Sequence, residues 1–169
     1  VLDHLSGQLV ISIAAGLRLA DIGRWLGGYR RLVRTMPNTP ALIGAGITGL
    51  FADPSVDREG RDMAEKILGA VGTTLWMADE AKMDAVTAVS GSGPAYVFYF
   101  IEALESAARE LGFDDAAARK LAVETFVGAS RLVESSSEPV SVLRQHYERV
   151  ADGSRRVARL AYAGHNDHP

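Results

Sequence analysis

The sequence predicts an α/β domain followed by an all-helical domain. In its first half, short apolar runs of strand length alternate with helical patterns, which is typical of a mostly parallel sheet with helices packed on it. From Ala78 onward, every patterned segment is helical. We therefore expect the C-terminal part of a doubly wound, Rossmann-like domain over residues 1–77, an all-α dimerisation domain over residues 78–150, and a divergent, disordered tail over residues 151–169.

The elements of the first half follow from apolar runs and from punctuation by glycine and proline. The run LVISIAA (9–15) is continuously apolar, as expected for a strand that is buried on both faces. Ser55 is a suitable N-cap for the helix that follows it. We expect strands at residues 9–15, 31–35, 46–52 and 73–77, and helices at residues 17–26 and 56–68.

The second half contains only helical patterns, which Gly112 and Asp114 divide as stop and start signals. We expect helices at residues 81–89, 95–111, 115–133 and 140 to about 150. The helix at 95–111 begins with the run YVFYFI (96–101), which puts apolar side chains on every face. Because such a helix must be surrounded by protein, we expect a homodimer or larger homo-oligomer in which these helices interleave. The alternative is that the run packs under the chain's own α/β half.

Composition limits the class of protein. Of the 169 residues, 47 % are hydrophobic and 23 % are charged, which is typical of a globular chain rather than a disordered one. The net charge of −3 gives no sign of a nucleic-acid surface. Cysteine is absent, which excludes disulfides and thiol chemistry. The longest apolar run, 95–101, is too short to span a bilayer, and no secretory signal is visible, so we expect a cytoplasmic protein without membrane or nucleic-acid partners.

One glycine motif has the wrong context for phosphate binding. The run GAGITG (44–49) matches the G-x-G-x-x-G fingerprint letter for letter. That fingerprint requires a strand before it and a helix opening within it. Here a proline-bracketed loop precedes the run and a strand is expected within it, so we interpret it as a glycine-rich connection.

Two other punctuated loops are better candidates for a site. In SGSGPAY (90–96), Gly91 and Gly93 permit a sharp turn, and Pro94 suits the first position of the next helix. The opening turn of that helix offers backbone N–H groups to an anion such as a carboxylate. In MPNTP (36–40), two prolines hold an amide and a hydroxyl in a stiff loop at the end of a strand, where open α/β sheets bind ligands. For the first loop, a plain interhelical turn is the alternative.

These segments together resemble pyrroline-5-carboxylate reductase, an enzyme of proline biosynthesis. The resemblance is carried by VRTMPNTPALIGAGITGL, by DAVTAVSGSGPAY and by SIAAG (12–16), and it extends over residues 9–146. It implies an oxidoreductase that reduces 1-pyrroline-5-carboxylate to L-proline with NADP or NAD as the cofactor. Another imine or 2-hydroxyacid reductase of the same architecture is a further possibility.

The resemblance also implies the site residues. Those implied to bind the cofactor are Ala14, Ala15, Gly16, Asn38 and His146, and those implied to bind substrate are Glu80, Ser90, Gly91, Ser92 and Gly93. Glu80 would contact the ring nitrogen and hold the imine proton, with Asp84 as a weaker candidate. From pattern alone, the small residues at 14–16 could equally serve helix–strand packing, and Glu80 could be a surface residue at a helix start. The pattern identifies no metal site, because the two histidines near the C-terminus are expected to be solvated.

The chain departs from the family pattern at both ends. Nothing before Leu9 supplies the glycine-rich βαβ turn that holds the cofactor pyrophosphate. His146 stands where the family begins a loop rich in Ser, Thr and Gly that grips the substrate carboxylate, but here the sequence continues YERVADGS. We expect the tail from Tyr147 to be unrelated to the family. Two hypotheses therefore stay open, a reductase and a non-catalytic dimerisation fragment of one.

Overall fold

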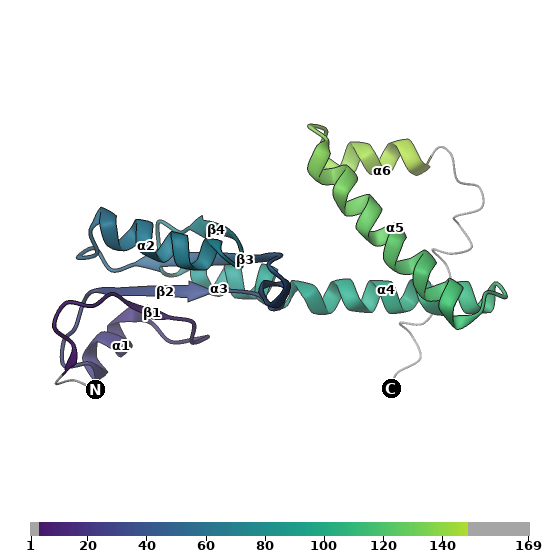
Figure 1. Cartoon of the computed structure of the whole chain (residues 1–169). Helices are drawn as coiled ribbons and strands as arrows, with labels where there is room; N and C mark the ends of the chain where they lie inside the picture. The colour runs from purple at the N-terminus through teal and green to yellow at the C-terminus, as the bar shows by residue number, and fades with distance from the viewer. Residues whose placement is uncertain (1–3, 149–169) are drawn as a thin grey trace. The chain divides into compact units, whose positions relative to one another are not determined.

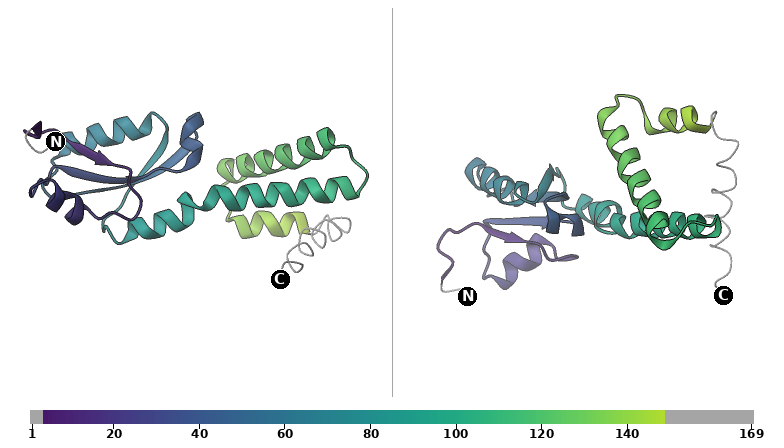
Figure 2. Two further views of the ribbon diagram at one scale, coloured as in Figure 1. Left: turned by 90° about the horizontal axis from the view of Figure 1, so that it is seen from below. Right: turned by 45° about the vertical axis from the view of Figure 1, so that its right-hand side comes forward.

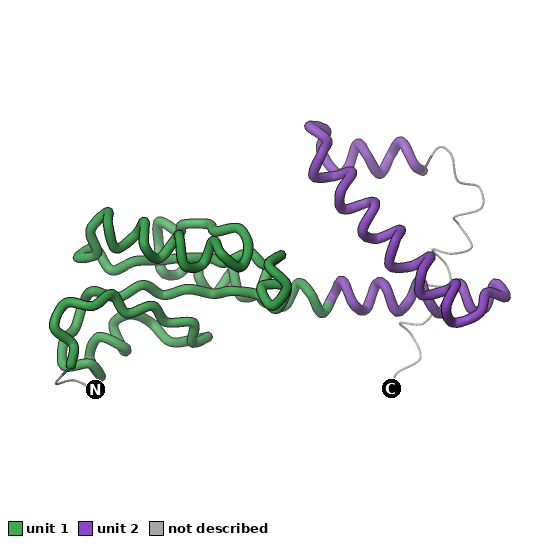
Figure 3. Tube along the Cα trace, viewed as in Figure 1, with its two compact units in different colours: residues 1–95 green, residues 96–169 purple. Residues whose placement is uncertain are grey.

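The computed structural model describes residues 4–148 and divides into two compact units (Figure 3). Unit 1 is Val1–Ala95 and unit 2 is Tyr96–Pro169. A domain boundary at residues 77 and 78 stays a prediction, and the predicted tail at 151–169 lies outside the described residues.

Unit 1 contains a four-stranded sheet with the order β1-β2-β3-β4 (Figure 1). Its elements are β1 (Val10–Ser12), α1 (Leu19–Trp25), β2 (Leu32–Met36), the 3-10 helix η2 (Thr39–Ile43), β3 (Gly46–Ala52), α2 (Arg58–Gly69), β4 (Gly72–Trp76), α3 (Lys82–Val86) and the π-helical turn η3 (Thr87–Gly91). The α/β class is as predicted, and the expected strand at 46–52 matches β3 at both ends.

The sheet is parallel-rich, with one antiparallel pair. Strands β1 and β2 are parallel, β2 and β3 are antiparallel, and β3 and β4 are parallel. The antiparallel pair has a simple cause: only residues 37–45 connect β2 to β3. A parallel pair needs a crossover of about a dozen residues or more, so this connection is too short for one.

One face of the sheet forms the core of unit 1 with α2. The buried members of this core are Val33, Leu50, Ala52, Val56 and Ala64. A turn at residues 54–55 buries Val56, and α2 begins only at Arg58, later than the sequence suggested. The N-cap is Asp57, whose Oδ1 accepts the N–H of Gly60 at 2.8 Å. The prediction of Ser55 as the cap was wrong, because its hydroxyl donates instead to the carbonyl of Arg30.

The segment SGSGP does not form the sharp turn that its glycines suggested. The chain runs from α3 through η3 into α4 (Gly93–Glu110), and neither Gly91 nor Gly93 has a positive φ. The N–H of Ser92 donates to the carbonyl of Thr87 at 2.9 Å, which is the wide spacing of a π-turn. A Cβ on Gly91 would lie 3.0 Å from Cε of Met36, so this glycine permits close approach to β2 rather than a turn.

Unit 2 consists of the rest of α4 together with α5 (Asp115–Ser135) and α6 (Val140–Glu148) (Figure 2). The predicted punctuation is confirmed. Gly112 has a φ of +95° after the end of α4, and Asp114 caps α5 by accepting the N–H of Ala117 at 2.8 Å. Among the described residues, no helix is both long and apolar enough to cross a membrane.

In the described part of unit 2, the fully buried hydrophobic residues are small, and many of the large ones are exposed. Within the described part of the unit, the buried members of this set are Ala107, Ala118 and Ala122. The aromatic row of α4, which we define as Tyr96, Phe98, Tyr99 and Phe100, is at least half exposed at every position. Phe100 makes a ring contact with Phe126 of α5, at a centroid distance of 6.1 Å. Most of this apolar surface is therefore uncovered in the single chain.

Candidate functional site

A buried arginine lies in the middle of β2. Arg34 is only 3 % exposed, and it alternates with Val33, which faces the core under α2. Successive strand residues point to opposite faces, so Arg34 lies on the other face of the sheet. There it forms ion pairs with Glu80 at 3.4 Å and with Asp84 at 3.1 Å. Charged side chains are almost never buried without such partners.

Glu80 joins three separate elements. It lies in the turn before α3, where its Oε1 accepts a hydrogen bond from Nη1 of Arg34 on β2. The same oxygen accepts the backbone N–H of Leu19, the first residue of α1, at 2.7 Å. The N-cap residue of α1, Arg18, makes no side-chain capping bond, so Glu80 supplies an acceptor that the local sequence lacks. The Glu80 side chain is thus half-buried and accepts two hydrogen bonds.

The turn after β1 lies directly before α1. Strand β1 ends at Ser12, earlier than the predicted residue 15, and Gly16 adopts a φ of +75°. A Cβ on Gly16 would meet no atom within 4 Å, so the backbone of the turn faces open space. Its start is fixed by the N–H of Ala14, which donates to Oγ of Ser12 at 3.3 Å. A flat ring could lie against this open backbone.

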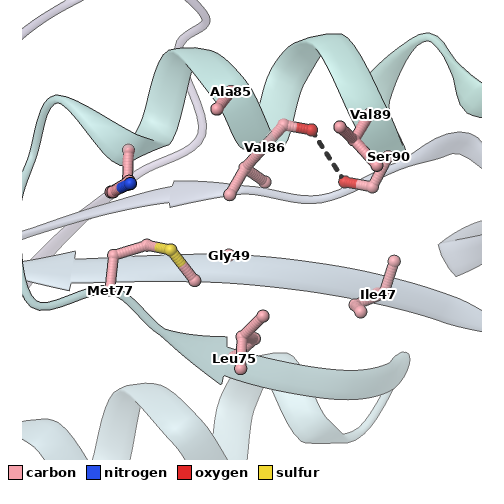
Figure 4. A pocket seen from close by; sticks show the side chains of 9 residues that line it. Ile47, Gly49, Leu75, Met77, Ala85, Val86, Val89 and Ser90 are labelled. Atoms are coloured by element: carbon pink, nitrogen blue, oxygen red, sulfur yellow. Dashed lines mark hydrogen bonds between the residues drawn. The ribbon is translucent and has the colours of Figure 1, made fainter.

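Asn38 fixes the proline-bracketed loop. Its Oδ1 accepts the N–H of Ile47 at 3.0 Å, which ties the loop to the start of β3. Ile47 in turn lines an apolar pocket of about 290 Å³ on the face of the sheet opposite α2 (Figure 4). The pocket is lined by Ile47, Gly49, Leu75, Met77, Lys82, Ala85, Val86, Val89 and Ser90.

The pocket is formed where α3 and η3 pack on β3. A Cβ on Gly49 would lie 2.8 Å from Cγ1 of Val86, so the absence of a side chain there sets how closely α3 approaches the sheet. Figure 4 shows Val86 and Val89 facing Ile47 and Leu75 across the pocket. The hydroxyl of Ser90 donates to the carbonyl of Val86 at 3.0 Å. The lining suits an apolar group rather than a carboxylate.

The remaining predicted site residues lie in two places. Ser92 is exposed, and its hydroxyl donates to the carbonyl of Thr87 at 3.4 Å, while Gly93 is the first residue of α4. His146 lies on α6 of unit 2, where its Nδ1 is 3.8 Å from Oε2 of Glu138. Unit 1 alone therefore brings Glu80 to the start of α1, three residues beyond the turn at residues 14–16. Ser90 lines the pocket, and Asn38 is bonded to the backbone of Ile47, which also lines it.

Sequence reasoning missed Arg34. The available signal was a charge inside the apolar strand pattern RLVRT (31–35), which a solvated strand end also explains. No pattern in the sequence linked Leu19 with Glu80. Among residues 4–148, no group of three or more His, Cys, Asp or Glu is placed to hold a metal ion.

The family model for pyrroline-5-carboxylate reductase dimerisation matches residues 80–150. Pyrroline-5-carboxylate reductase of Pseudomonas aeruginosa is 46 % identical over 139 residues, which are 82 % of this chain and 51 % of that protein. The Haemophilus influenzae protein of the same name is 41 % identical over 157 residues, or 92 % of this chain and 57 % of that one. The chain thus spans about half the length of these curated relatives.

Solved structures of reductases from the same family also resemble this chain. A pyrroline-5-carboxylate reductase from Coxiella burnetii superposes with a TM-score of 0.79 at 38 % identity, covering 96 % of this chain and 66 % of that one. The Plasmodium falciparum pyrroline carboxylate reductase with NADP bound gives a TM-score of 0.76 at 28 % identity, covering 94 % and 69 % of the two chains.

Proposed function

We propose that this chain takes part in reducing 1-pyrroline-5-carboxylate to L-proline with NADPH or NADH, because it belongs to the pyrroline-5-carboxylate reductase family. The observation that carries the proposal is the 2.7 Å hydrogen bond between the N–H of Leu19 and Oε1 of Glu80. It places the carboxylate that is implied to bind substrate three residues beyond the turn that is implied to bind the cofactor.

The turn at residues 14–16 fits the nicotinamide end of the cofactor. Its residues are small, Ala15 and Gly16 are exposed, and the space beside Gly16 is open. Ala14, Ala15 and Gly16 would hold the ring against the backbone, while Asn38 keeps the neighbouring loop in place. When bound, the cofactor supplies a hydride to the C=N carbon of the substrate. The task of the protein residues is to orient the two reactants and exclude water.

Glu80 would hold a proton on the substrate nitrogen. An imine carbon accepts hydride more readily when its nitrogen is protonated, and a nearby carboxylate favours that cationic form. In the described part of the chain, both hydrogen bonds to the Glu80 side chain fall on Oε1. Oε2 is therefore the oxygen that would accept the N–H of the substrate. The residues Ser90, Gly91, Ser92 and Gly93 would frame the ring, as the family resemblance implies.

The reaction can be tested in the direction of proline oxidation. The full chain is mixed with L-proline and either NAD⁺ or NADP⁺, and formation of the reduced cofactor is followed by absorbance. We expect turnover, with a loss of about 100-fold or more in Glu80→Gln, because the substitution removes the carboxylate charge. The matched control is Asp79→Asn in the same turn, where Asp79 accepts the N–H of Ala81 and should not affect turnover. Equal rates in the two variants would contradict the role of Glu80.

A dimerisation module without turnover is the second candidate function. It is favoured by the exposed aromatic row of α4 and by the match of residues 80–150 to a dimerisation model. In either case we propose that a second copy of the chain covers the row, in a homodimer or larger homo-oligomer. Sedimentation of the full chain measures association, and titration with NADP⁺ measures cofactor binding. A stable oligomer with neither binding nor turnover would favour the module over the reductase.

A further inference from the structure

Arg34 is more buried than its two acidic partners. Its side chain is 4 % exposed, whereas that of Glu80 is 23 % exposed and that of Asp84 is 65 % exposed. A buried guanidinium needs compensating charges, and its planar donors fix the directions in which those charges lie. Arg34 Nη1 reaches Glu80 and Nη2 reaches Asp84, so one rigid group holds both acids.

The position of the Glu80 carboxylate depends on these contacts. Glu80 lies in a turn, and a glutamate side chain has several rotatable bonds that a turn does not restrain. Its two hydrogen bonds come from Arg34 on β2 and from Leu19, which is 61 residues away in the sequence. Of the two donors, only Arg34 belongs to a buried strand of the sheet. Arg34 is therefore the rigid donor that holds the Glu80 carboxylate in position to accept the N–H of Leu19.

We propose that Arg34 is a positioning residue that holds the Glu80 carboxylate against the N–H of Leu19, and thereby joins the turn at residues 14–16 to that carboxylate as one unit. The positioning of Glu80 stands on the contacts alone. Its consequence for hydride transfer rests on the proposed function. Arg34 touches neither substrate nor cofactor in this proposal, and it acts through Glu80.

The first experiment measures amide hydrogen exchange at Leu19 by NMR in the full chain. Glu80→Ala removes the acceptor and defines the exchange rate of the unbonded amide. We expect Arg34→Met to raise exchange at Leu19 toward that rate, by about tenfold or more, while core amides such as that of Leu50 keep their protection. The matched control is Arg31→Met, because Arg31 lies just before the same strand and forms an ion pair with Asp57 instead of Glu80. It should leave Leu19 unchanged.

The outcomes separate positioning from general stability. An unchanged Leu19 rate in Arg34→Met, beside a raised rate in Glu80→Ala, would overturn the proposal. So would an equal rise at Leu19 and at Leu50, because it would indicate that the whole unit had loosened. If Arg34→Met does not fold, Arg34→Lys replaces it. Lysine keeps the charge but lacks the second fixed donor, so exchange at Leu19 should lie between the wild-type and Glu80→Ala rates, and a wild-type rate would overturn the proposal.

The second experiment measures proline oxidation in the same variants. We expect Arg34→Met to lower kcat/KM for L-proline by about 10- to 100-fold, since a misplaced group can cost that much, with an unchanged Kd for NADP⁺. Arg34→Lys should restore part of the loss, and Arg34→Met should add nothing in a Glu80→Ala background. Additive losses would overturn the catalytic part of the proposal. A wild-type chain without turnover would reject the proposed function alone, because the exchange experiment still decides the positioning of Glu80.

Discussion

The two units of this chain bury apolar surface in opposite ways. Unit 1 packs the branched and aliphatic residues of β2, β3 and α2 into a core of its own, in which Val33 and Leu50 are fully buried. In the described part of unit 2, the buried hydrophobic residues are alanines, and the large aromatic residues of α4 are half exposed or more. The comparison indicates that unit 1 has an apolar core of its own, whereas unit 2 leaves large apolar side chains uncovered in the single chain.

Spectroscopy can follow the two units separately. Both tryptophans, Trp25 and Trp76, belong to unit 1. Trp76 packs against the core and donates from Nε1 to Glu65 at 3.1 Å. Tryptophan fluorescence therefore reports on unit 1, while far-ultraviolet circular dichroism also reports on the long helices of unit 2.

The largest expected effect is in the core of unit 1. Leu50→Ala leaves a cavity beside Val33 and Ala64, and we expect it to lower the free energy of unfolding of unit 1 by about 2–5 kcal/mol. Urea unfolding followed by tryptophan fluorescence measures this loss. A loss below about 1 kcal/mol would contradict the view that unit 1 depends on its own core.

The next effect tests whether unit 2 depends on cover from a second chain. Phe98→Ser removes an exposed ring that has no role in the core of unit 1. We expect the dissociation constant of the oligomer to rise by about 10- to 100-fold, or about 1.4–2.8 kcal/mol, with an unchanged fluorescence midpoint. Sedimentation velocity measures the first quantity, and Glu110→Ser at the other end of α4 is the control. Unchanged association would show that the aromatic row is not the contact.

A smaller effect is expected at the start of α5. Asp114→Ala removes the acceptor for the N–H of Ala117 and should destabilise unit 2 by about 1 kcal/mol. Asp114→Asn keeps an N-cap oxygen and should retain most of the stability. Circular dichroism during urea unfolding measures both variants. A shift in the fluorescence transition instead would indicate that the helix start supports unit 1.

The smallest effect depends on pH and lies in unit 1. The hydrogen bond from the N–H of Gly60 lowers the pKa of Asp57 below its ordinary 3.8, burial opposes this shift, and the charge of Arg31 supports it. Since the folded pKa is depressed, the unfolded chain binds more protons around that pKa. The stabilisation is therefore complete above the ordinary value and is lost as the pH falls through the folded value.

Asp57→Asn isolates this contribution. Because asparagine does not titrate, the variant should lose less free energy of unfolding than wild type between about pH 6 and about pH 3. Tryptophan fluorescence in urea measures the difference at each pH, and Asp62→Asn on the same helix is the control. An identical pH dependence in Asp57→Asn and wild type would show that the Asp57 N-cap does not contribute to the loss of stability in acid.

The regular elements could be predicted wherever local pattern decides them. Strand β3 was predicted at both ends because the run from Gly46 to Ala52 is bounded by a glycine turn and by Asp53. The start of α2 was misplaced because burial of Val56, a tertiary effect, delays the helix. The prediction of a sharp turn at SGSGP was wrong for a similar reason, since Gly91 accommodates Met36 of a distant strand. Local sequence does not distinguish that use of glycine from a turn.

The candidate site could be predicted only in part from the sequence. The family resemblance pointed to Glu80 and to the turn at residues 14–16, but it did not show that they are joined. The Glu80 carboxylate is held by Leu19, just after that turn, and by Arg34, whose charge within a strand pattern is also explained by a solvated strand end. The bond from Leu19 to Glu80 joins residues 61 positions apart, and the bond from Arg34 to Glu80 joins residues 46 positions apart. Both depend on the packing of β2 against α1 and the turn before α3, and no periodic pattern encodes them.

The uninterrupted path from η3 into α4 also restricts how this region can evolve. A residue inserted or deleted between Gly93 and Ala95 would rotate every later side chain of α4 by about 100° relative to the residues before it, displacing all four aromatic positions together. Substitutions there act one at a time, whereas a change of length acts on the entire row. Natural variants of this chain should therefore keep the number of residues in α4 constant and vary in length at the connection between α5 and α6, residues 136–139.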